Sequence, residues 1–124
     1  MLRCALLLLA GLALVAPALA QRNFPAHALR GEMLIVQPPD LSIDGKPARL
    51  APGARIRDER NMLAMSGAMV DRRVVVHYTI EPNGMLLDVW VLTPQELARQ
   101  PWPKTLDEAR SWVFDPVGQS WSKR

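Results

Sequence analysis

The pattern of apolar and polar residues divides the chain into a short leader and a β-rich remainder. Residues 5–16 are an unbroken apolar run of twelve, whereas later apolar positions fall mostly in short alternating stretches. Alternation with a period of two places apolar side chains on one face of a strand. The pattern therefore predicts many short strands, and ten of the 11 prolines lie after residue 20, which also disfavours long helices.

The clearest predicted element is a hairpin formed by residues 74–80 and 85–92. Both segments are rich in β-branched and other apolar residues that favour strands. Pro82 and Gly84 suit the turn, because proline presets φ and glycine adopts the left-handed conformation. Both faces are largely apolar, so the hairpin is expected at the centre of the domain, covered on two sides. The predicted register pairs Val76 with Trp90, Tyr78 with Asp88 and Ile80 with Leu86, and places Val75, His77, Val89 and Val91 on the other face.

Shorter elements are predicted on either side of this hairpin. Residues 32–36 favour a strand, and Asp44-Gly45 between two alternating stretches is typical of another hairpin. Residues 58–70 fit either a helix or a loop followed by a short strand. Two capping boxes, at residues 93–96 and 105–108, predict two short helices near the C-terminus.

Together these elements predict a mainly β, α+β domain. We expect a small, bent antiparallel sheet or open barrel of four to six short strands, with one or two short C-terminal helices. This single domain is expected to span residues 31–116, between a flexible arm over residues 21–30 and a frayed tail over residues 117–124. The 104 residues that remain after removal of 20 from 124 are enough for one domain with an apolar core.

The leader has the features of a cleaved secretory signal. Arg3 precedes the apolar run, Pro17 interrupts it, and residues 18–20 are Ala-Leu-Ala, as signal peptidase requires. We expect cleavage after Ala20 and a periplasmic or secreted protein with no membrane span, because the run is too short to cross a bilayer. The alternative is an uncleaved anchor. The only cysteine, Cys4, precedes the run, which argues against a lipoprotein and leaves the mature chain without disulfides.

The charge distribution supplies one candidate site. Without residues 1–20 the chain has 14 basic and 12 acidic residues, a balance that does not point to nucleic acid. Arg55 and Arg57 are two apart on a predicted strand and would share a face with Arg49, where guanidinium groups could hold phosphate or carboxylate. The alternative is a solvated outer face, neutralised by nearby acids. No stacking aromatic residues alternate with these arginines, as a nucleic-acid groove would require.

Tryptophans and methionines supply two further candidates. Three of the four tryptophans lie in the last 23 residues, where they either cover one end of the sheet or, at Trp112, anchor a partner. Met62, Met65 and Met69 could bind Cu(I), because soft thioethers select that ion. Alternatively, these methionines fill gaps in the core.

The sequence offers few residues suited to catalysis. The mature chain has two histidines, His27 and His77, and neither has a nearby partner in sequence for proton transfer. Its serines lack the context of a nucleophile elbow, and no phosphate-loop, zinc-protease or calcium-loop motif occurs. We therefore expect a protein that is not an enzyme and needs no cofactor.

Two partial resemblances add to this interpretation. Residues 74–116 resemble the C-terminal domain of TonB-type energy transducers in their strand–turn–strand pattern and in the stretches Leu106–Ala109 and Trp112–Pro116. Residues 92–96 depart from that family. The whole mature chain is more similar to short uncharacterised exported proteins of Gram-negative bacteria, with residues 49–57 (RLAPGARIR) as their mark. That second resemblance implies export and no particular activity.

The sequence thus predicts an exported, non-catalytic module of the cell envelope that binds a protein partner or an anionic envelope component. The candidate binding residues are Arg49, Arg55, Arg57 and Trp112. The alternative is a carrier of a small ligand or of Cu(I), with Met62, Met65 and Met69 as the metal ligands.

Overall fold

The computed structural model describes residues 21–124, so the predicted signal segment lies outside the described residues. No helix in this part of the chain is long and apolar enough to span a membrane. In chain order, the elements are β1 (Leu29–Gln37), β2 (Asp40–Ile43), β3 (Lys46–Arg57), β4 (Leu63–Ala64), the 3-10 helix η1 (Ser66–Met69), β5 (Arg73–Ile80), β6 (Leu86–Val91), α1 (Pro94–Leu97), α2 (Leu106–Ser111), β7 (Val113–Asp115) and β8 (Ser120–Ser122).

Six strands form one bent sheet in the order β2-β1-β5-β6-β3-β4, which confirms the predicted mainly β class with two short helices near the C-terminus. β2 also pairs with β3, so the pairings run in a closed circuit through β1, β2, β3, β6 and β5. The expectation of a purely antiparallel sheet is wrong for one pair, because β3 and β6 are parallel. β3 is long enough to pair with β2 through Arg49 and with β6 from Leu50 onward, with an irregularity between Leu50 and Arg55 where Gly53 has a positive φ.

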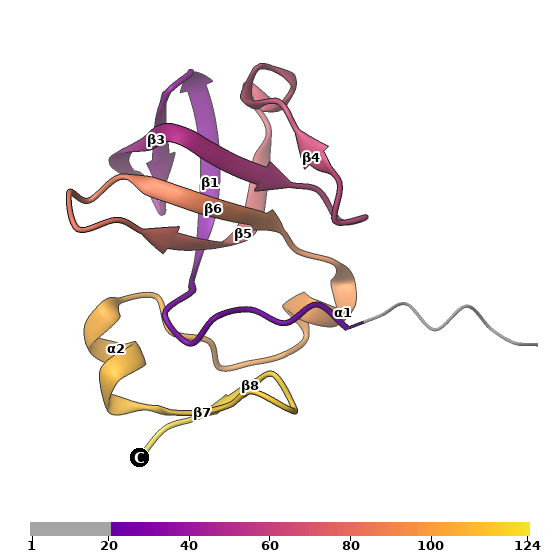
Figure 1. Ribbon diagram of the computed structural model, residues 1–124, viewed down its shortest axis with the longest axis vertical. Coiled ribbons are helices and arrows are strands. Elements are labelled where there is room, and N and C mark those ends of the chain that lie inside the picture. The colour runs from indigo at the N-terminus through magenta and orange to yellow at the C-terminus, as the bar shows by residue number, and fades with distance from the viewer. Residues whose placement is uncertain (1–20) are drawn as a thin grey trace, which may run out of the picture.

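The β5–β6 hairpin lies between two apolar clusters, as its two apolar faces predict. The inner cluster packs Val76 and Val89 against side chains from β1, β2 and β3. The outer cluster covers the opposite face with Phe24, Trp102 and Trp121, from the two ends of the described chain. Figure 1 shows the result as a bent sheet above a second layer that contains α1, α2, β7 and β8.

The predicted register of this hairpin is correct next to the turn and wrong beyond it. A bulge sets two residues of β6 opposite Thr79, whose Oγ1 accepts a hydrogen bond from the Asp88 N–H at 3.1 Å. Every pair beyond the bulge is shifted by one residue, so Val89 and Val91 face the inner cluster rather than the side of His77. The observed pairs are Ile80–Leu86, Tyr78–Val89, His77–Trp90 and Val76–Val91.

Both ends of the described chain differ from the flexible arm and frayed tail that the sequence predicts. Phe24 and Ala28 are buried in the outer cluster, and β1 already begins at Leu29. Trp121 is buried on β8, which pairs with β7. The physical reason is that the outer face of β5 and β6 is apolar, and these end segments are what removes it from water.

Candidate functional site

The predicted arginine face is only partly available for a ligand. Arg57 is half-buried, donates a hydrogen bond to Asp88 at 3.3 Å and holds its guanidinium carbon 5.7 Å from the centre of the Trp90 ring. Arg49 and Arg55 are exposed on β3. The pairing with Asp88 commits Arg57 to its own sheet, so a ligand would meet mainly Arg55 and Arg49, whose Nε lies 3.9 Å from Asp40 Oδ1 in an exposed pair.

Trp112 and Met69 pack into the domain, as the alternatives given by the sequence allow, whereas Met62 and Met65 are exposed. Trp112 is half-buried against the outer cluster, with Lys123 Nζ 5.1 Å from the centre of its ring, so it is not an exposed anchor. Met69 is 4% exposed inside the inner cluster, whereas Met62 and Met65 are 63% and 81% exposed. One thioether therefore serves as core packing while the other two face solvent, and the predicted Cu(I) site is not assembled.

The residues around β4 form an exposed apolar surface instead. Leu63 on β4 is 73% exposed, and Met62 and Met65 flank the strand. β4 lies at the end of the strand order, where its outer edge has no neighbouring strand among the described residues. Beside it runs a groove of about 530 Å³. We call this the β4 surface; its groove is lined by Pro38, Pro39, Leu50, Ala54, Ile56 and Ala64, among others.

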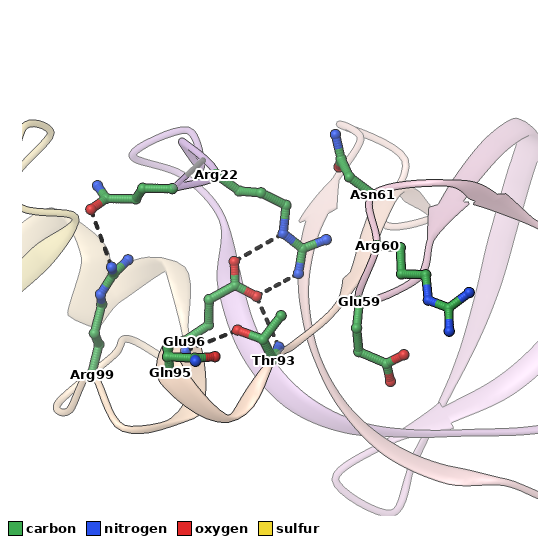
Figure 2. Close-up of a pocket in the computed structure, with 9 residues that line it drawn as sticks. Arg22, Glu59, Arg60, Asn61, Thr93, Gln95, Glu96 and Arg99 are labelled. Atoms are coloured by element: carbon green, nitrogen blue, oxygen red, sulfur yellow. Dashed lines mark hydrogen bonds and ion pairs between the residues drawn. The ribbon is translucent and has the colours of Figure 1, made fainter. Parts of the chain in front are cut away.

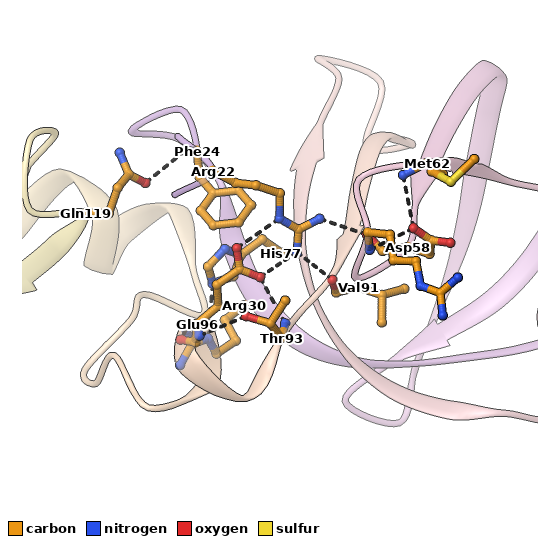
Figure 3. Close-up of polar contacts among 11 residues, drawn as sticks. Arg22, Phe24, Arg30, Asp58, Met62, His77, Val91, Thr93, Glu96 and Gln119 are labelled. Atoms are coloured by element: carbon orange, nitrogen blue, oxygen red, sulfur yellow. Dashed lines mark hydrogen bonds and ion pairs between the residues drawn. The ribbon is translucent and has the colours of Figure 1, made fainter. Parts of the chain in front are cut away.

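A buried ion pair joins the N-terminal segment to α1. Arg22 Nε donates to Glu96 Oε2 at 2.9 Å, and Arg22 Nη2 donates to Glu96 Oε1. The same guanidinium donates to the carbonyl oxygens of Asp58, at 2.9 Å, and Val91, at 2.7 Å. One side chain thus fastens the N-terminal segment to the ends of β3 and β6 and to α1, as Figure 3 shows.

The Thr93–Glu96 capping box forms as predicted and prepares this ion pair. The Thr93 N–H donates to Glu96 Oε1 at 2.9 Å, and the Glu96 N–H donates to Thr93 Oγ1 at 3.2 Å. Burial acts to raise the pKa of Glu96, but hydrogen bonds from Arg22 and Thr93 outweigh it and hold the pKa below its ordinary value. Glu96 is therefore a carboxylate at neutral pH, matched to the Arg22 guanidinium.

His77 is enclosed in the outer cluster and has a structural role. Its ring stacks on Trp102 with the ring centres 4.0 Å apart, and its Nε2 accepts a hydrogen bond from Arg30 Nε at 3.1 Å. Burial, followed by the positive charges of Arg30, Arg22 and Arg99, lowers the pKa of His77 to about 2. The imidazole is neutral at physiological pH and fully buried, so it does not meet a substrate from solvent.

A polar pocket of about 640 Å³ lies over the Arg22–Glu96 pair (Figure 2). Its walls come from three stretches that are far apart in sequence, residues 21–22, 59–61 and 93–99. On one side, Arg99 donates to Gln21 Oε1 at 3.2 Å. This arrangement concentrates charged and carboxamide side chains around one hollow, which makes it a second candidate site.

The sequence pattern does not reveal Arg22 and Arg30, because both lie in the segment expected to be a flexible arm. One signal was present: Phe24 is a large aromatic residue that a solvated arm would leave exposed. An aromatic residue two positions after Arg22 indicates that this segment packs against the domain. It does not identify Glu96 or His77 as the partners, since those contacts join residues 74 and 47 positions apart.

The fold and its surfaces define a small β-rich domain with an exposed apolar edge and a polar pocket. Comparison of the chain with protein-family models, curated proteins and solved structures finds no match. The two resemblances described above therefore stay predictions. The β4 surface and the polar pocket are therefore the two candidate functional sites.

Proposed function

We propose that the chain is an exported, non-catalytic module that binds a protein partner in the bacterial cell envelope through the β4 surface. The observation that carries this proposal is the exposure of Met62, Leu63 and Met65 at 63%, 73% and 81% beside an apolar groove. Contiguous exposed apolar side chains mark interaction sites, and an edge strand offers unpaired backbone groups as well. Methionine side chains also adapt easily to the shape of a partner.

The charges next to the β4 surface favour an acidic partner. Arg49 and Arg55 are exposed on β3, the strand that pairs with β4 and lines the groove. Carboxylates around an apolar anchor would meet these arginines at the rim, where charges mainly speed association and select partners. A purely anionic envelope component is less well supported, because Arg57 is already paired with Asp88.

The leader and the buried histidine support the other two parts of the proposal. The apolar run at residues 5–16, followed by Ala-Leu-Ala at residues 18–20, favours export and cleavage after Ala20. Mass spectrometry of the protein recovered from a periplasmic fraction should find Gln21 at its N-terminus. Recovery of the intact chain in the cytoplasm would contradict export.

For the non-catalytic part, the support is that His77 serves as a buried acceptor for Arg30.

Photocrosslinking in intact cells tests the binding surface. A photoreactive residue at Met65 should give a discrete crosslinked band, whereas one at the exposed Lys104, two residues before α2, should not. Leu63→Ser should reduce the band at position 65 several-fold without changing the melting temperature, because the Leu63 side chain is already exposed. Equal bands at both positions, or a band that Leu63→Ser leaves unchanged, would refute a role for the β4 surface.

A further inference from the structure

We propose that the polar pocket over the Arg22–Glu96 pair binds a short zwitterionic peptide. This site does not use the exposed methionines or the groove of the β4 surface. It therefore goes beyond the proposed function, and either proposal can fail without the other.

The floor of the pocket is fixed before any ligand arrives. Arg22 donates hydrogen bonds to Glu96 and to the carbonyl oxygens of Asp58 and Val91, so its charge and most of its donors are engaged within the protein. Glu96 in turn accepts from the Thr93 N–H. The floor consequently supplies shape and rigidity, and a ligand does not have to order it.

One wall of the pocket is a turn held by Asp58. Asp58 Oδ1 accepts hydrogen bonds from the N–H groups of Arg60 at 2.9 Å and Met62 at 3.0 Å. The Asn61 N–H donates to the Asp58 carbonyl oxygen at 2.9 Å, with Asn61 at a φ of 62°, which asparagine tolerates. The backbone of residues 58–62 is thereby fixed, and Glu59, Arg60 and Asn61 line the pocket from it.

The side chains around this pocket are available to a ligand. Figure 2 shows Glu59, Arg60, Asn61 and Gln95 with no interaction drawn to any other lining residue, in contrast to Arg22, Glu96 and Thr93. They present one carboxylate, one guanidinium and two carboxamides. Arg99 adds a second positive charge on the opposite side, next to Gln21.

These groups match the chemistry of a short peptide. A simple anion attracted by Arg60 would also meet Glu59, and a simple cation attracted by Glu59 would meet Arg60 and Arg99. A peptide with free ends carries an ammonium for Glu59 and a carboxylate for the arginines. Its amide groups both donate and accept, as the carboxamides of Asn61 and Gln95 do. The volume of about 640 Å³ is typical of pockets for small ligands.

Titration with three forms of one tripeptide tests the proposal. Ala-Ala-Ala, its N-acetylated form and its C-terminal amide are added to the purified protein, and binding is followed by amide chemical shifts in NMR spectra. We expect saturable shifts at residues 59–61 and 93–99 with the free tripeptide. Blocking either end should weaken binding roughly tenfold, because each block removes one charge-assisted contact.

Matched variants test which charged side chain contacts each end of the peptide. Arg60→Gln should weaken binding of the free tripeptide roughly tenfold but change binding of the C-terminal amide little. Glu59→Gln should likewise weaken binding of the free tripeptide roughly tenfold but change binding of the N-acetylated form little. Arg55→Gln removes an exposed arginine that does not line this pocket, so it should bind all three peptides like the wild type.

Several results would overturn the peptide site. If no saturable shifts appear up to about 10 mM free tripeptide, any affinity is too weak to matter and the proposal is wrong. Equal affinity for the three peptide forms, or shifts that lie outside residues 59–61 and 93–99, would also overturn it. Inorganic phosphate is the last probe: if it binds as tightly as the free tripeptide, the site is a general anion site and the proposal is wrong.

Discussion

Replacing His77 with glutamine tests the buried contact with Arg30 through the pH dependence of stability. In the folded protein, burial and then the charges of Arg30, Arg22 and Arg99 lower the pKa of His77 to about 2, from an ordinary value of 6.5. Below pH 6.5 the unfolded chain therefore takes up a proton that the folded protein does not. The contribution of His77 to the unfolding free energy is therefore fully present above pH 6.5 and is lost as the pH falls toward 2.

The size of the effect follows from this difference in pKa. Each pH unit below 6.5 costs about 1.36 kcal/mol of unfolding free energy, so the fall from pH 7.5 to pH 5 removes about 2 kcal/mol. Ordinary carboxylates titrate mostly below this range, so the difference between the wild type and a variant at His77 isolates the contribution of His77. Glutamine keeps an acceptor for Arg30 Nε but does not titrate. The His77→Gln variant should therefore lose about 2 kcal/mol less than the wild type over this interval.

Urea denaturation at pH 7.5 and pH 5, followed by tryptophan fluorescence, measures this difference. Trp102 stacks on His77, so its fluorescence reports on the same cluster. His27 is exposed, and His27→Gln serves as the control that should keep the wild-type dependence on pH. If His77→Gln and the wild type lose the same unfolding free energy between the two pH values, the assignment of His77 as a neutral buried acceptor is wrong.

Two further predictions concern the packing of the domain, and urea denaturation checks both. Glu96→Ala leaves its guanidinium partner buried and unpaired, so it should lower the unfolding free energy by about 3–5 kcal/mol. Asp107→Ala breaks an exposed pair and should cost less than about 1 kcal/mol; equal costs would contradict the role of the buried pair. Gly31→Ala should cost about 1–3 kcal/mol, because a Cβ there would lie 2.7 Å from Ile43 Cγ2. An unchanged midpoint for Gly31→Ala would show that β1 and β2 can separate at little cost.

The sequence predicts those parts of the fold that depend on local pattern. The β5–β6 hairpin is apolar on both faces, and two clusters cover it. The bulge opposite Thr79 is not predictable from alternation, because one extra residue changes the register without changing the composition. The parallel pairing of β3 with β6 cannot be predicted from local pattern either, because it joins two strands that are far apart in the sequence.

The candidate sites are less predictable, because they depend on contacts between distant residues. The Thr93–Glu96 capping box is a local motif and forms as expected. No local sequence feature indicates that Glu96 also forms an ion pair with Arg22, which comes from the other end of the described chain. The methionine spacing suggests one helical face, but Met69 packs in the core while Met65 faces solvent, since the segment folds as a short strand and a 3-10 turn.

The turn at residues 58–62 connects the two candidate surfaces. The Asp58 carbonyl oxygen accepts a hydrogen bond from Arg22 beneath the polar pocket. The Asp58 carboxylate accepts one from the Met62 N–H at the start of the β4 surface. A change at Asp58 would disturb both surfaces, so loss of binding in such a variant would identify neither. Arg60→Gln and Leu63→Ser alter exposed side chains on either side of Met62 and leave these hydrogen bonds in place. If Arg60→Gln weakens only peptide binding and Leu63→Ser weakens only partner crosslinking, two separate sites lie at one rigid turn.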